Sequence, residues 1–333
     1  MKFSIFHFPF SIIVGCLLFT ACTSRINVDH IPVNIEVQRF DRDLQAVVAD
    51  TSLLPAMRER YSTFFEPYNT SLIGIGNSHH PFYIAMLNKF MNSPVVKMAY
   101  DEVERVFPDE KALNAALTGG FRHLKYFFPD IHIPEVYAYV SGFNEAIVLT
   151  DSVIGVGLDR FLGDTCSLYN QLEIPRFLQY NMRPERIPIE CLQRWLCSYY
   201  YLEDGVMTTL LQEMIYDGKI WYVTKQCFPN VADTLLFGFR PEQLAWCRSY
   251  EAGMWAYLLE NQELYTNNQF TIHKYVGDAP FTAAFARESP GKAVVWLGYR
   301  IVEAYMKRNK STTLPELMSI DAQTILRGSR YNP

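Results

Sequence analysis

Three short β-rich runs in the middle of the chain, with amphipathic helical patterns on both sides of them, constrain the fold most. Residues 136–140, 146–149 and 153–158 are rich in β-branched and aromatic side chains, and turn-forming residues separate them. This spacing predicts a small antiparallel meander. A further strand is predicted over 33–37, where apolar and polar residues alternate.

Apolar residues recur at helical spacing throughout the rest of the chain. They predict helices over 53–65, 82–90, 95–107, 113–128, 192–199, 207–215, 244–258 and 294–306. Asp217 and Gly218 follow one of these patterns, and because glycine commonly stands just beyond a helix end, they predict its C-terminus. The fold class predicted is α+β, mostly helical, because strands and helices do not alternate as βαβ units. With helices on both sides of the sheet, residues 31–333 are expected to form a single domain.

The N-terminus combines one charge, Lys2, with an apolar run over 3–19 and small residues before Cys22. This order is typical of a secretory signal peptide, and the uninterrupted apolar stretch is shorter than the ~20 residues of a spanning helix. Thr20-Ala21-Cys22 resembles the lipobox of bacterial lipoproteins, although Phe19 stands where that family favours leucine. The resemblance implies a signal peptide over 1–21, an acylated Cys22 and a lipidated tether over 22–30. An ordinary cleaved signal and an uncleaved anchor are the alternatives.

The composition is that of an ordinary globular protein, with 49% hydrophobic residues, 20% charged residues and a net charge of -5. Nucleic acid is not expected as a partner because no cluster of lysine and arginine is present to neutralise phosphates. Five cysteines follow Cys22, and they form no CxxC pair. One or two isolated disulfides and buried free thiols are both compatible with this pattern.

Few side chains offer catalytic or metal-binding chemistry at a recognised spacing. HExxH and GxSxG are absent, so neither a metal nor a cofactor is predicted. Asp159, Arg160 and Asp164 follow the last β-rich run and form the candidate polar site. They are suited to binding a cation or to acting as an acid–base pair. The alternative is a structural ion pair that fixes the sheet to the following loop.

Several long segments resemble the gliding motility-associated lipoprotein family GldB. The segments lie over 35–41, 61–76, 121–144, 157–163, 180–188 and 290–302. The resemblance covers essentially the whole mature chain. It implies a lipoprotein of the cell envelope that supports gliding motility or an associated secretion machinery.

The GldB family is itself distantly similar to predicted zinc proteases, in which a sheet of this kind precedes an HExxH helix. This similarity implies a zincin-like fold. The corresponding helix here carries Glu190 without histidine, and one carboxylate cannot supply the three or four ligands of zinc. Where those proteases have an acidic residue followed by glycine, this chain has Asp217 and Gly218. Lys219 is expected to repel a cation there, so this chain is not expected to retain the zinc site of those proteases.

Three functions remain as hypotheses. The first is a non-catalytic envelope lipoprotein that is held to a membrane through its lipid and binds a protein partner. The second is a hydrolase of the peptidase kind that depends on a metal or on carboxylates. The third is a periplasmic small-molecule binder that uses the aromatic interior, because the chain contains 21 Tyr, 23 Phe and 5 Trp.

Overall fold

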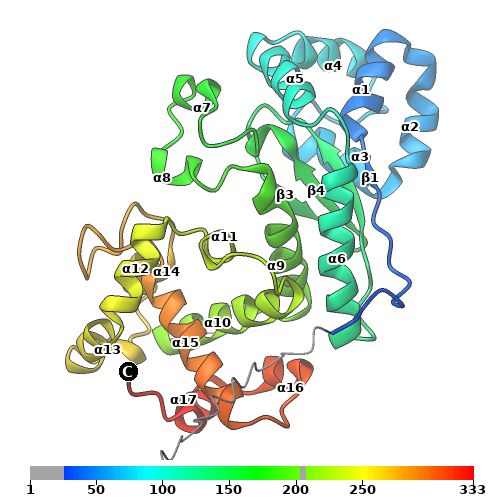
Figure 1. The fold of residues 1–333 in the computed structure, drawn as a ribbon. Helices are drawn as coiled ribbons and strands as arrows, with labels where there is room; N and C mark the ends of the chain where they lie inside the picture. Colours follow the sequence, from blue (N-terminus) through cyan, green and yellow to red (C-terminus); the bar gives the residue numbers. More distant parts are fainter. Residues whose placement is uncertain (1–25, 203–207) are drawn as a thin grey trace, which may run out of the picture.

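The computed structural model describes residues 26–202 and 208–333 and has the N-terminal helices at one end, a small sheet in the middle and the C-terminal helices at the other end (Figure 1). The N-terminal group is formed by α1 (Phe40–Ala49), α2 (Leu54–Arg60), α3 (Ser62–Pro67), α4 (Tyr83–Met91) and α5 (Pro94–Val106). The long helix α6 (Lys111–Phe127) runs from this group along the sheet. The middle of the chain adds α7 (Ser167–Gln171), α8 (Arg176–Gln179) and α9 (Ile187–Tyr199). The C-terminal group contains α10 (Leu210–Cys227), α11 (Asp233–Phe237), α12 (Pro241–Ser249), α13 (Glu251–Glu260), α14 (Gln269–Val276), α15 (Ala293–Arg308), α16 (Leu314–Ser319) and α17 (Ala322–Ser329).

The sheet has four strands, β1 (Val37–Gln38), β2 (Glu135–Tyr139), β3 (Ile147–Leu149) and β4 (Val153–Gly157), in the order β1-β2-β4-β3. The α+β class is confirmed, but the prediction of an antiparallel meander is wrong. β1, β2 and β4 are parallel, and only the edge strand β3 is antiparallel to its neighbour. Burial explains this order: all five residues of β4 are buried, whereas β3 is half-buried to exposed. A strand that is apolar throughout belongs in the centre of a sheet.

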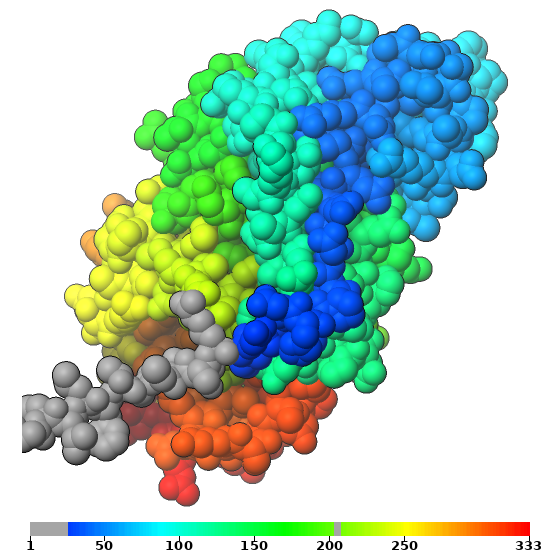
Figure 2. Space-filling model, turned by 45° about the vertical axis from the view of Figure 1, so that its right-hand side comes forward, coloured from blue at the N-terminus to red at the C-terminus, as the bar shows by residue number. Residues whose placement is uncertain are grey.

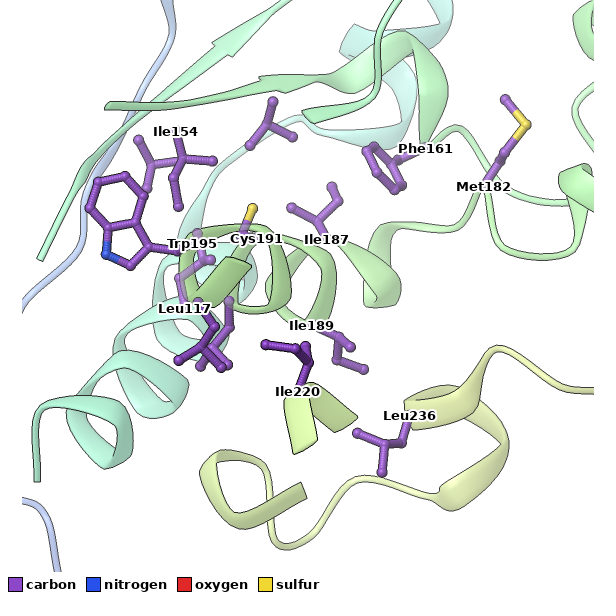
Figure 3. Close-up of a cluster of buried hydrophobic side chains, with 14 of the residues drawn as sticks. Leu117, Ile154, Phe161, Met182, Ile187, Ile189, Cys191, Trp195, Ile220 and Leu236 are labelled. Atoms are coloured by element: carbon purple, nitrogen blue, oxygen red, sulfur yellow. The ribbon is translucent and has the colours of Figure 1, made fainter. Parts of the chain in front are cut away.

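Helix α9 lies at the centre of the core, between the sheet and the C-terminal helices. Figure 3 shows its side chains Ile187, Cys191 and Trp195 among apolar groups of neighbouring elements. Ile154 comes from β4 and Ile220 from α10. The buried hydrophobic residues of the described chain form one continuous cluster that reaches from Val33 to Ile325. Both ends of the molecule therefore share a single core.

Helix α10 continues through Asp217 and Gly218 to Cys227, so the predicted helix end at these residues is wrong. The glycine serves packing instead. A Cβ on Gly218 would lie 2.6 Å from the carbonyl oxygen of Gly298 in α15. The two helices therefore cross at a distance that only glycine permits.

The patterns over 53–65 and 244–258 are each divided in the structure. Tyr61 separates α2 from α3, and Tyr250 separates α12 from α13. The predicted helices that correspond to α4, α5, α6 and α15 agree with the structure to within two residues at their ends. Helix α9 begins five residues before the predicted start at 192.

The five cysteines after Cys22 are all free thiols, and four of them are buried. Of the two alternatives, the structure has the buried thiols. Among the described helices, none combines the length and the apolar character that crossing a membrane requires.

Candidate functional site

The residues of the predicted polar site lie in different environments. Asp159 is fully buried and accepts hydrogen bonds from the backbone amides of Ser141 and Phe143, at 3.1 and 2.7 Å. Burial raises the pKa of Asp159 to about 6. Asp164 is exposed. Asp159 therefore organises the 141–143 loop beneath the surface, and the two aspartates do not face a common site.

Arg160 is the member of this group that reaches a cavity. It donates to the carbonyl oxygen of Phe143 at 3.2 Å, and its buried Nε has no hydrogen-bond partner. Its side chain lines a cleft of about 640 Å³, which is within the size range of ligand pockets. We call this cavity the α9–α10 cleft.

The α9–α10 cleft is built from segments that lie far apart in the chain. Helix α9 contributes Glu190, Gln193, Arg194 and Cys197, and α10 contributes Asp217, Ile220 and Trp221. The remaining walls come from α8, from the segment over 237–243 and from the residues on either side of the α15 N-terminus. Figure 1 shows α8 above α10, α11 and the N-terminal part of α12. Glu145, Ala146, Arg160 and Phe161, next to β3 and β4, complete the lining, so the cleft depends on the packing of α9 and the C-terminal helices against the sheet.

Glu190 and Asp217, the two residues that the protease similarity identified, lie in the same cleft. Glu190 forms an ion pair with Arg186, with 3.3 Å between Oε1 and Nε. Arg186 also donates to the carbonyl oxygens of Leu235 and Leu236. Glu190 is therefore tied to a buried arginine that fixes the end of α11.

Asp217 is enclosed by protein although its side chain reaches the cleft. Its pKa is raised to about 6, mainly by burial and to a smaller extent by Glu213, while Lys292 and Arg194 act in the opposite direction. Lys219 does not face Asp217, so the expected repulsion of a cation by Lys219 is wrong. Its Nζ donates to the carbonyl oxygens of Met318 and Ile320 instead, because successive residues of a helix point in different directions.

Basic side chains slightly outnumber the acidic ones around the cleft, whose acidic members are Glu145, Glu190, Asp217 and Asp278. Arg160, Arg186, Arg194, Arg240 and Lys292 line it. Lys292 forms an ion pair of 2.7 Å with Asp278. The other walls are aromatic, with Trp221 4.9 Å from Phe237 and 5.9 Å from Phe239 between ring centroids.

The thiol in the cleft is protonated at neutral pH. Burial raises the pKa of Cys197, and a hydrogen bond with Tyr216 lowers it in part. Because the thiolate is the reactive form of cysteine, this side chain is a poor nucleophile. In the described ranges 26–202 and 208–333, no group of three or more His, Cys, Asp or Glu is arranged to hold a metal ion. Cys22, the predicted lipid attachment residue, lies outside the described residues.

Comparison with known proteins assigns the chain to a family. The family model for the gliding motility protein GldB matches residues 21–333. The chain belongs to the GldB family. Neither a curated protein nor a solved structure matches this GldB-family chain. Membership supports a lipoprotein and suggests a gliding motility-related role, whereas the zincin-like fold implied by the protease similarity remains a prediction.

Sequence reasoning missed most of the cleft. It identified Arg160 for another reason, and it identified Glu190 and Asp217 only through the protease similarity. Arg240 and Lys292 stand in segments without a motif. Their convergence depends on tertiary packing that local patterns do not encode.

Proposed function

We propose that this GldB-family protein is a non-catalytic lipoprotein of the cell envelope that acts by holding a segment of a partner protein in the α9–α10 cleft. The observation that carries the proposal is the cleft itself. Its volume of about 640 Å³ is sufficient for several side chains of a peptide. It combines aromatic walls with charged groups, as specific protein interfaces do.

The environment of the polar groups favours binding over chemistry. Glu190 is held by Arg186, and the thiol of Cys197 has a raised pKa. The side chain of Gln193, one turn of α9 beyond Glu190, has a buried amide nitrogen without a partner. An amide of this kind orients a ligand through hydrogen bonds but neither attacks it nor transfers protons at neutral pH.

The predicted lipid anchor would keep the cleft close to a membrane. Ile26, the first described residue, follows Cys22 by four positions. An extended chain reaches at most ~3.6 Å per residue, so Ile26 would lie within about 14 Å of the lipid. Figure 2 places the first described residues, in dark blue, beside the base of α6 and above the orange and red C-terminal helices. The N-terminal helices α1–α5 would then point away from the membrane.

Site-specific photo-crosslinking in intact cells tests this proposal. A photoreactive phenylalanine analogue at Phe177, which lines the cleft, is expected to give a covalent adduct with a partner protein. The same analogue at Phe82, which is 68% exposed on the N-terminal half, is the matched control and is expected to give none. The absence of an adduct from Phe177, or equal adducts from both positions, would contradict the proposal.

A carboxylate-dependent hydrolase is the second candidate, and Asp217 is the observation that favours it. A carboxyl group with a pKa of about 6 in a cleft is suited to general acid–base catalysis. Hydrolysis of envelope peptides by the purified full-length protein that is lost in Asp217→Asn would support this candidate. Retention of the crosslinked partner by the same variant supports the binding function.

A further inference from the structure

Apart from Arg194, whose charge acts on Asp217, three described arginines at the α9–α10 cleft have no carboxylate partner within ion-pair distance. Arg160 and Arg240 line the cleft, and Arg183 lies next to it in sequence and in space, since it shares the ring of Tyr180 with Arg240. None of the three belongs to an ion pair within the part of the chain that the structure describes. Guanidinium groups without a counter-charge in a concave surface attract anions, because the surrounding protein screens charge less than water does.

Two of these arginines, Arg183 and Arg240, place their positive charges at the same tyrosine ring. The Cζ atoms of Arg183 and Arg240 lie 4.2 and 4.4 Å from the centroid of the same ring. The π-face of tyrosine attracts each cation but offsets only part of the repulsion between them. Negatively charged groups at the edge of this ring would supply the missing charge and accept planar, paired hydrogen bonds from either guanidinium group.

Donors without partners are present at the same place. The Nε atoms of Arg160 and Arg183 and the Nε2 atom of Gln193 are buried and have no hydrogen-bond partner. Buried polar atoms are almost always paired in folded proteins, so these donors indicate acceptors that a ligand would bring. Asn181 Oδ1, a buried acceptor without a partner in the same cleft, would receive a hydrogen bond from a donor of the ligand. Two of the three donors are guanidinium groups, which form stronger hydrogen bonds with carboxylates than with neutral acceptors.

The carboxylates of the cleft are largely committed elsewhere. Glu190 pairs with Arg186, and Asp278 pairs with Lys292. Asp217 faces Arg194 and Lys292. Glu145 at the rim is exposed. The positive charge of Arg160, Arg183 and Arg240 therefore remains available.

We infer that the occupant of the cleft is an acidic peptide segment of a partner protein. Its carboxylates bind Arg160 and the two arginines that stack on Tyr180. Its apolar residues pack on the wall formed by Trp221 and Phe239. The inference rests on the proposed function and names the chemistry of the partner. The distance between ring centroids of 5.9 Å for Trp221 and Phe239 shows that this wall is continuous. Carboxylates next to aromatic or aliphatic residues match the two kinds of surface together.

Selection from a random library of short peptides against the full-length lipidated protein tests the inference. Peptides enriched in Asp and Glu are expected, and their affinity should fall as salt is raised. Arg240→Gln is expected to weaken them roughly tenfold, which is the loss of one charge-assisted hydrogen-bond pair. Arg240 is exposed and caps α12 through its backbone, so this variant is expected to fold. Arg105→Gln on α5, which removes an exposed arginine far from the cleft, is the matched control and should leave the affinity unchanged.

The contrary outcomes separate the inference from the function on which it rests. One contrary outcome is a set of selected peptides without enrichment in Asp and Glu, whose affinity falls in Phe177→Ala but not in Arg240→Gln. This outcome would contradict the acidic ligand while supporting a peptide-binding cleft. If no selected peptide binds the wild type more tightly than it binds Phe177→Ala, both the inference and the proposed function are wrong. If inorganic phosphate alone raises the melting temperature of the wild type and not that of Arg240→Gln, while no peptide is selected, the ligand bears phosphate and the inference is wrong.

Discussion

Gly218 of α10 and Gly298 of α15 lie against each other where the two helices cross. A Cβ on Gly218 would lie 2.6 Å from the carbonyl oxygen of Gly298, and a Cβ on Gly298 would overlap the carbonyl group of Met214. Real Cβ atoms do not approach backbone this closely. The crossing holds together the helix that carries Asp217 and the helix that follows Lys292, and both residues line the cleft.

Gly298→Ala is expected to destabilise the protein by about 3 kcal/mol, because the added methyl group forces two buried helices apart. Gly253→Ala is the matched control. Gly253 also stands inside a helix, α13, and a Cβ there meets no atom within 4 Å. That substitution should raise the free energy of unfolding by about 0.5–1 kcal/mol. Urea denaturation measures both, and equal effects of the two substitutions would contradict the role of the crossing.

Asp159→Ala is expected to lower the free energy of unfolding by about 2–4 kcal/mol, since it leaves two buried backbone amides without an acceptor. Asp159→Asn keeps an oxygen at this position and should cost less than half as much. Asp164→Ala, at an exposed aspartate five residues later, should change stability by no more than about 0.5 kcal/mol. Similar losses at Asp159 and Asp164 would show that the two act together after all.

The sheet shows which parts of the fold local patterns can predict. The three mid-chain strands were located from their residue types, and the helical periodicity of α5 and α6 gave their extents. Strand order was not predictable in this way. Val37 pairs with Val136, about 100 positions away in the chain, and Val136 pairs with Ile154. A run of three to five β-branched residues has the same local pattern whichever strand it pairs with.

The cleft was less accessible to sequence reasoning for a related reason. Glu190 and Asp217 were identified through similarity to zinc proteases, but their meeting in one cavity follows from the packing of α9 on α10. Gly218 was interpreted as a helix end because glycine has this role most often. The helix continues past Gly218, which lies where α10 contacts Gly298 of α15 and leaves no room for a larger residue.

The stability of the protein is expected to depend on the ionisation of Asp217. The folded state holds the pKa of this carboxyl at about 6, above the ordinary value of 3.8, because burial outweighs the attraction of Lys292 and Arg194. Below about pH 3 the carboxyl is protonated in both states, so it has no effect on stability. As pH rises from about 4 to 6 the unfolded chain loses this proton first, and the folded state is destabilised by about 1–3 kcal/mol.

Urea denaturation of wild type and Asp217→Asn between pH 4 and 8 measures this effect. The amide cannot ionise, so the variant should gain stability relative to the wild type across pH 4–6 and keep that gain above pH 6. Asp159 has a raised pKa in both proteins, so its contribution cancels in the comparison. Glu145→Gln removes a charge from the exposed rim of the same cleft and serves as the control. If the difference in free energy of unfolding between wild type and Asp217→Asn does not vary with pH, the pKa of Asp217 is not raised in the folded state.

Cys22→Ala is expected to release the protein from the membrane fraction or to leave it as an uncleaved precursor, because the substitution removes the thiol to which the predicted lipid is attached. Several acyl chains stabilise membrane attachment by ~0.8 kcal/mol for each buried methylene, so the wild type should remain bound through high-salt and carbonate washes. Cys16→Ala, six residues earlier and inside the predicted signal peptide, is the matched control and should leave attachment unchanged. Mass spectrometry of the N-terminal peptide checks the same prediction directly. An unmodified Thr23 at the N-terminus, or a retained Met1 in the wild type, would show that Cys22 does not carry the predicted lipid. The cleft would then not be held near the membrane by this anchor.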